Sequence, residues 1–229
     1  MAVIVSPRLS VLLDAVGALS AGPGIVGGKA FGLARLSNHD VRVPPWFVLP
    51  ATVFREHLVS AGVAGEVRAL IGGLEGDRSR SEIAHVSAQL RELVATVDVD
   101  GELRSAIDAM RSHLGAGPLA VRSSAADEDS ASHSFAGQLD TVLDVNDETL
   151  EAAIRRCWRS AFNERVLDYR LRTASLSATE DVAVIVQTMI RGDVSGVLFT
   201  ADPITGRLLP ARENRPQRGN DGVDASHDR

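Results

Sequence analysis

A single lysine, Lys29, lies in a glycine-rich turn of this 229-residue chain, whose other 23 basic residues are arginines. The two cations are nearly equivalent on a solvated surface, but they differ where a compact ammonium group must fit a tight anion site. Gly27 and Gly28 precede the lysine, and glycines let backbone N–H groups approach a phosphate. A helix that begins there adds positive potential. The pattern predicts a phosphate contact at Lys29. The alternative is that Lys29 is an ordinary residue on a helix surface, where a lysine has been kept by chance.

A second group of phosphate-binding side chains follows the apolar run 119–121, in the order Arg122, Ser123 and Ser124. Ligands tend to bind at strand ends in sheets covered by helices. A guanidinium group can grip a phosphate through two parallel hydrogen bonds, and serine hydroxyls can donate to its oxygens. The alternative for this run is a strand end that carries a surface salt bridge.

An acidic run and a glycine loop come next along the chain. The acids at 127–129 could hold Mg²⁺ or orient the arginine, although a solvated acidic turn has the same composition. The run 134–138, which includes Gly137 and Gln138, could fold over a bound polyphosphate. The later run 194–203 suits a strand and a turn, and its residue types indicate no chemistry.

The elements that must position these residues can be predicted from the spacing of apolar residues, which has the period of a strand in some segments and that of a helix in others. Runs rich in apolar and β-branched residues predict strands at 46–49, 119–121, 139–145, 182–190 and 194–200, the last two forming a hairpin. Apolar residues at helical spacing predict a helix from Lys29, helices over 52–60, 83–97 and 103–114, and a long helix from Asp147 as N-cap through Tyr169. This mixture of hairpin strands and helices predicts an α+β (mixed α/β) fold.

Composition excludes several classes of protein. The formal net charge of −6 argues against a broad nucleic-acid-binding face. We expect no membrane partner, because no apolar run approaches the roughly 18 residues of a membrane span. The first ten residues lack the pattern of a secretory signal. The single cysteine, Cys157, rules out an internal disulfide and suits a reducing cytoplasm. Because Cys157 lies on an apolar helical stripe, we expect it to be a buried small residue.

Two segments differ from the rest in composition. Five glycines in 62–80 predict a flexible connection within a domain that spans 1–207. Only five of the 22 residues in 208–229 are apolar, so we expect a disordered tail there.

In this order, the segments resemble the N-terminal nucleotide-binding domain shared by phosphoenolpyruvate synthase, pyruvate phosphate dikinase and rifampicin phosphotransferase. The resemblance covers about 15–207 and rests on six ordered motifs: 26–30, 43–48, 120–125 with 128–129, 134–141, 157–170 and 196–206. The pair Cys157-Trp158 and the run 199–203 look slightly closer to the rifampicin and synthase branches.

The resemblance implies an ATP-grasp-like domain that binds MgATP between two α+β lobes. Such domains pass a phosphoryl group to a histidine on a swivelling domain, and from there to pyruvate or an antibiotic. By resemblance, Lys29 and Arg122 contact the ATP phosphates, and Gly137, Gln138 and Thr141 lie in or beside the covering glycine loop. With Ser123 and Ser124, these residues form the expected ATP site; we assign no catalytic or metal-ligating residue.

The family pattern ends at Arg207. The family continues with a Gly-Leu-Gly-Glu segment and a Gln-x-Arg-Pro strand, and neither follows here. None of the six histidines has the Thr-Cys-His context of the phosphoacceptor. We therefore expect an incomplete ATP-binding portion of a phosphoenolpyruvate synthase-like phosphotransferase that does not complete the reaction alone. The alternatives are a rifampicin phosphotransferase-like fragment, a non-catalytic split-protein module whose second chain supplies the rest and the phosphohistidine domain, and a frameshifted remnant.

Overall fold

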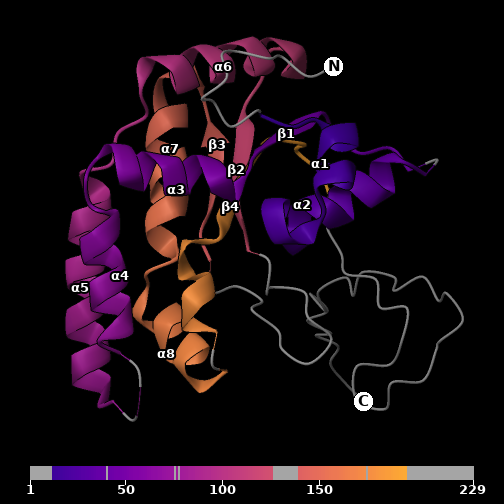
Figure 1. Ribbon diagram of the computed structural model, residues 1–229. Coiled ribbons are helices and arrows are strands. Elements are labelled where there is room, and N and C mark those ends of the chain that lie inside the picture. The colour runs from indigo at the N-terminus through magenta and orange to yellow at the C-terminus, as the bar shows by residue number, and fades with distance from the viewer. Residues whose placement is uncertain are drawn as a thin grey trace, which may run out of the picture. The chain divides into compact units, whose positions relative to one another are not determined.

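A computed structural model describes residues 12–39, 41–74, 76, 78–125, 139–173 and 175–194 (Figure 1). The chain divides into two compact units, Met1–Met189 and Ile190–Arg229. All the described helices and strands belong to the first unit, and residues 190–194 of the second have neither.

The first unit is built on a four-stranded antiparallel sheet with the strand order β1-β4-β2-β3. The strands are β1 (Trp46–Leu49), β2 (Leu119–Ala125), β3 (Thr141–Val145) and β4 (Val182–Thr188). The uninterrupted apolar run at the start of β4 suits a central strand, and residues 182–186 are buried. The prediction of a mixed helix-and-strand fold is confirmed.

Helices cover both faces of the sheet. They are α1 (Ala15–Ala21), α2 (Pro23–Ser37), α3 (Ala51–Ser60), α4 (Ala64–Gly72), α5 (Arg80–Ala95), α6 (Gly101–Arg111), α7 (Asp147–Ser160) and α8 (Glu164–Arg172). Strand alternation places Phe47 and Val121 in the larger core cluster, with residues of α3 to α8. Trp46 and Ile185 lie in a smaller cluster on the opposite face, with α1 and α2 (Figure 1). The sheet thus separates two apolar cores.

The helices agree with the predictions over 52–60, 83–97 and 103–114, but the long helix predicted from Asp147 to Tyr169 is wrong. It is two helices, because α7 ends at Ser160 and Asn163 adopts extended backbone before α8. The N-cap of α7 is Asn146, one residue earlier than predicted. Its Oδ1 accepts a hydrogen bond from the Thr149 backbone N–H at 3.0 Å. Asparagine caps helices well because its side chain satisfies an otherwise unpaired N–H group.

The glycine-rich segment 62–80 also differs from the expected flexible connection. It contains α4, whose Ala64, Val67 and Ile71 are buried in the larger core cluster. Burial of this apolar stripe outweighs the cost of glycine in a helix. Residues 208–229 and the strand predicted from Val194 to Thr200, except for Val194 itself, lie outside the described residues.

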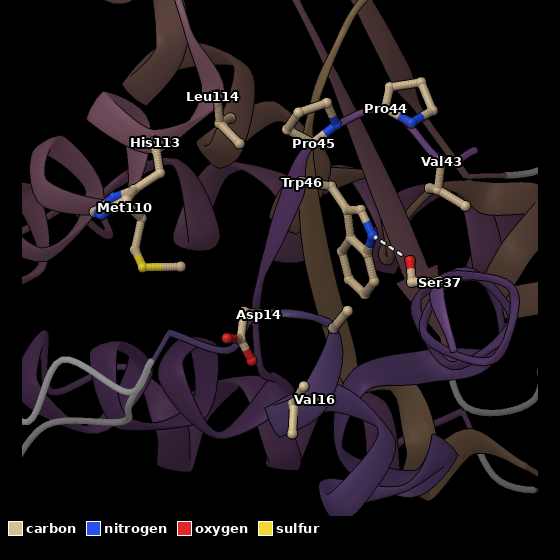
Figure 2. A pocket seen from close by; sticks show the side chains of 11 residues that line it. Asp14, Val16, Ser37, Val43, Pro44, Pro45, Trp46, Met110, His113 and Leu114 are labelled. Atoms are coloured by element: carbon tan, nitrogen blue, oxygen red, sulfur yellow. Dashed lines mark hydrogen bonds between the residues drawn. The ribbon is translucent and has the colours of Figure 1, made fainter. Parts of the chain in front are cut away.

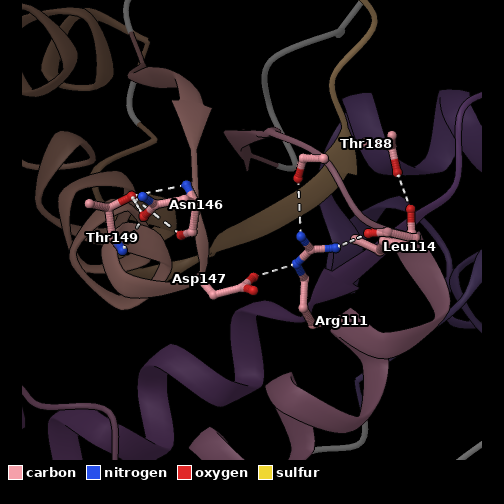
Figure 3. Close-up of polar contacts among 8 residues, drawn as sticks. Arg111, Leu114, Asn146, Asp147, Thr149 and Thr188 are labelled. Atoms are coloured by element: carbon pink, nitrogen blue, oxygen red, sulfur yellow. Dashed lines mark hydrogen bonds and ion pairs between the residues drawn. The ribbon is translucent and has the colours of Figure 1, made fainter.

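Arg111 holds the connection from α6 to β2 (Figure 3). Its guanidinium donates to the carbonyl oxygens of Gly115 and Gly117, the latter at 3.0 Å. The same side chain bonds Asp147 Oδ1 at 2.7 Å, at the start of α7. The Arg111 side chain is only 14% exposed, and its bonds to three separate residues fix where β2 begins.

Candidate functional site

The glycines before Lys29 lie inside α2 rather than ahead of it. The helix begins at Pro23, and proline is well suited to a first helical position because its N–H group is not needed there. Gly27 then adopts φ 78° and ψ 163°, which divides α2 into the segments 23–26 and 28–37. Lys29 is the second residue of the second segment. The predicted helix from Lys29 is therefore the continuation of a kinked one.

The kink lets α2 touch β2. A Cβ atom on Gly27 would lie 2.3 Å from both the backbone oxygen and the Oγ of Ser124, so only glycine fits. The Ala30 backbone N–H donates to Ser124 Oγ at 3.1 Å. The Lys29 ammonium donates to the Ser123 carbonyl oxygen at 3.2 Å. Residues 27–30 are thus docked on the last residues of β2.

Arg122 lies on the same face of β2 as Ser124, two residues earlier along the strand. Its side chain is half-buried, and among the described residues its guanidinium has no hydrogen-bond or ion-pair partner. Thr141 of β3 stands directly opposite Arg122 in the register and is exposed. Directly paired residues have Cβ atoms about 5 Å apart on one face of a sheet. The structure therefore places Arg122 and Thr141 side by side on the α2 face, and it places the Lys29 ammonium at the backbone of the next strand residue, Ser123.

The hydroxyl groups of the two predicted serines make hydrogen bonds within the fold. Ser123 points to the opposite face, where its Oγ donates to the Asp140 carbonyl oxygen at 3.0 Å and lies 3.1 Å from Ser160 Oγ. Ser124 accepts the hydrogen bond from Ala30. Direct contact of either serine with a phosphate remains a prediction. Gly137, Gln138 and the acidic run 127–129 lie outside the described residues.

The acid next to Thr141 does not neutralise this cationic face. The Asp140 carboxylate pairs with Arg156 of α7, with Nε and Oδ2 2.7 Å apart. That hydrogen bond, with the negative charge of Asp140, raises the pKa of the Arg156 guanidinium. Strand alternation sends Asp140 and Thr141 to opposite faces, so the Asp140 carboxylate does not lie on the face that carries the Arg122 side chain.

The described residues show neither a metal cluster nor a membrane span. Within the described ranges, no group of three or more His, Cys, Asp or Glu side chains could hold a metal ion. In the same part of the chain, every helix is too short or too polar to cross a bilayer.

An apolar pocket of about 360 Å³ opens elsewhere, where the start of α1, the start of β1 and the end of α6 meet (Figure 2). Its walls include Val16, Trp46, Met110 and Leu114, and Trp46 Nε1 donates to Ser37 Oγ at 3.3 Å. None of the residues predicted to bind phosphate lines this pocket. Apolar walls also suit a polyphosphate poorly, because buried charge needs polar partners.

Cys157 is fully buried, which confirms the expectation of a small core residue, and burial raises the pKa of its thiol to about 12. Since the thiolate is the reactive form, native protein at pH 8 should react with a disulfide reagent on the order of 1,000-fold more slowly than the urea-unfolded chain. Absorbance of the released aromatic thiol measures the rate, with Cys157→Ala as the blank. Complete labelling of the native protein within minutes would contradict the buried placement.

Comparison with known proteins gives consistent matches. The profile of the family described as "Pyruvate phosphate dikinase, AMP/ATP-binding domain" matches residues 23–215, which is eight residues past Arg207, the expected end of the family pattern. A rifampicin phosphotransferase from Streptomyces sp. is 40% identical over 205 residues, which is 88% of this chain and 23% of that protein. A probable phosphoenolpyruvate synthase from Methanothermobacter thermautotrophicus is 32% identical over 190 residues, or 80% of this chain and 28% of that protein. A prodigiosin synthesizing transferase from Serratia marcescens is 37% identical over 186 residues, or 80% of this chain and 19% of that protein. The chain thus spans about a quarter or less of the length of these relatives.

Proposed function

Because the chain belongs to the pyruvate phosphate dikinase AMP/ATP-binding domain family, we propose that it is the ATP-binding portion of a dikinase-type phosphotransferase. The sheet and its helices form one lobe of an ATP-grasp-like fold. ATP donates a phosphoryl group to a histidine supplied by another domain, on the same polypeptide or on a second chain. The phosphohistidine then phosphorylates the final acceptor.

One observation carries this proposal: the Lys29 ammonium lies 3.2 Å from the carbonyl oxygen of Ser123, the residue that follows Arg122 in β2, although Lys29 is distant from both in the sequence. The guanidinium can hold two phosphate oxygens, the ammonium adds a compact charge, and Thr141 can donate a hydroxyl hydrogen. Phosphoryl transfer is catalysed chiefly by positioning and by electrostatic stabilisation. In this proposal the two cations and the hydroxyl supply those two effects.

In this proposal Mg²⁺ enters with the ATP phosphates, and the acids at 127–129, which lie outside the described residues, are its candidate protein ligands. When bound there, Mg²⁺ neutralises phosphate charge. The role of Lys29 and Arg122 is to bind and orient the remaining phosphate oxygens.

The relatives' names suggest two final acceptors. We propose pyruvate, as in a phosphoenolpyruvate synthase, with rifampicin as the second candidate. The Streptomyces relative, which is named a rifampicin phosphotransferase, is 40% identical to this chain, and this similarity supports rifampicin as the second candidate.

Calorimetric titration of the folded chain with MgATP tests the proposed ligand. Lys29→Ala should weaken binding about 10- to 100-fold, because a hydrogen bond to a charged group contributes about 1.5–3 kcal/mol. Arg91→Ala is the matched control, since it removes one positive charge from an exposed site on α5, across the sheet from Lys29. Its affinity should equal that of the wild type. Absence of binding by folded wild type would refute the function, and equal affinity for Lys29→Ala would refute the role of Lys29.

A further inference from the structure

The position of Lys29 depends on a residue 95 positions further along the chain. We propose that Ser124 is a positioning residue for Lys29: its hydroxyl caps the second segment of α2 and thereby fixes where the ammonium group lies. This inference rests on the proposed function, in which Lys29 binds phosphate. It assigns Ser124 an indirect role, in place of the direct phosphate contact predicted from the sequence.

Helix capping provides the first step. Helices leave their first N–H groups without an intrahelical carbonyl partner, and the side chain of the N-cap residue normally accepts one of these hydrogens. Gly27 stands at the N-cap of the segment 28–37 and has no side chain. The Ala30 N–H, three residues later, is bonded instead by Ser124 Oγ at 3.1 Å. Ser124, which lies on strand β2, therefore replaces the missing N-cap side chain.

Burial shows that Ser124 cannot itself reach a solvent-borne ligand. Ser124 and Ala30 are both 0% exposed, and the backbone of Gly27 lies directly against Ser124. A phosphate that touched Ser124 Oγ would first have to displace α2. The hydroxyl therefore acts on the site through the helix.

The cap also controls the distance between the two cations. Lys29 immediately precedes the capped residue, and its ammonium donates to Ser123 O at 3.2 Å. Arg122 lies two residues before Ser124 on the same face. Fixing α2 on Ser124 therefore places Lys29 relative to Arg122, and small displacements of binding groups are costly.

The single lysine provides a direct readout. In the full chain labelled with 13Cε-lysine, NMR should show one lysine side-chain signal, that of Lys29. Ser124→Ala should shift or broaden this signal. Ser87→Ala is the control, because Ser87 is also buried and donates to a backbone carbonyl, Phe162 O at 2.7 Å. The control should leave the lysine signal unchanged, and an unchanged signal in Ser124→Ala would overturn the inference.

A double-mutant cycle separates positioning from direct contact. Ser124→Ala should weaken MgATP binding about 3- to 10-fold in the wild-type background and not at all in Lys29→Ala. Equal losses in both backgrounds would mean that Ser124 contacts the nucleotide itself, which overturns the inference. If wild type binds no MgATP, the proposed function fails, and the NMR comparison still decides whether Ser124 positions Lys29.

If Ser124→Ala does not fold, exchange of the Ala30 amide hydrogen in the wild-type chain provides the test. A capped amide should exchange at least about 100-fold more slowly than a free one. Exchange at the rate of an exposed amide would overturn the proposed cap.

Discussion

Gly27→Ala is expected to lower the free energy of unfolding by at least about 3 kcal/mol. A side chain at φ 78° and ψ 163° costs about 1–3 kcal/mol in backbone strain alone. The new methyl group would also lie 2.3 Å from the backbone of Ser124, which forces α2 and β2 apart. Urea unfolding followed by far-UV circular dichroism measures the loss.

Gly22→Ala is the matched control for this prediction. Gly22 has nearly the same backbone angles, φ 80° and ψ 167°, but its Cβ would meet nothing within 4 Å. It should lose about 1–3 kcal/mol, the backbone cost alone. The difference between the two variants therefore measures the close approach of α2 to β2. Equal losses would mean that Gly27 does not touch Ser124.

The elements that could be predicted from the sequence are those whose signal is local. The apolar stripes over 83–97 and 103–114 predicted α5 and α6, and the run 46–49 predicted β1. The glycines in 62–80 predict a flexible connection, but Ala64, Val67 and Ile71 have offsets of 3 and 7 residues, which is a helical period.

The candidate site was predictable only in part, because its geometry depends on long-range contacts. The residue types pointed to Lys29 and Arg122, but nothing near Gly27 in the sequence indicates a contact with Ser124, almost a hundred residues away. Adjacent strand residues point to opposite faces, and this alternation argues against the prediction that the side chains of Ser123 and Ser124 both contact one ligand. The structure sends the first to α7 and the second to α2.

Trp158→Ala is the second change with a large expected effect, a loss of about 3–5 kcal/mol in the free energy of unfolding. Trp158 of α7 is 1% exposed, and its ring stacks on Phe54 of α3 with centroids 5.3 Å apart. Its ring also faces the ring of His57, which lies about one helical turn after Phe54 on α3, with centroids 5.7 Å apart. Removing the indole would leave a cavity between α3 and α7, two of the helices that cover this face of the sheet.

The loss of packing in Trp158→Ala should be confined to the larger core cluster, because the sheet separates it from the α2 face. Trp158 belongs to the larger cluster, whereas Lys29 and Arg122 lie on the α2 face, and changes at separated sites are close to additive. At a temperature where Trp158→Ala remains folded, its MgATP affinity should therefore stay within about twofold of wild type. Trp158→Phe, which keeps an aromatic ring against Phe54, should lose less than half as much stability. A large fall in affinity with the variant still folded would contradict the separation of the two faces, and a stability loss below about 1 kcal/mol would contradict the packing of Trp158.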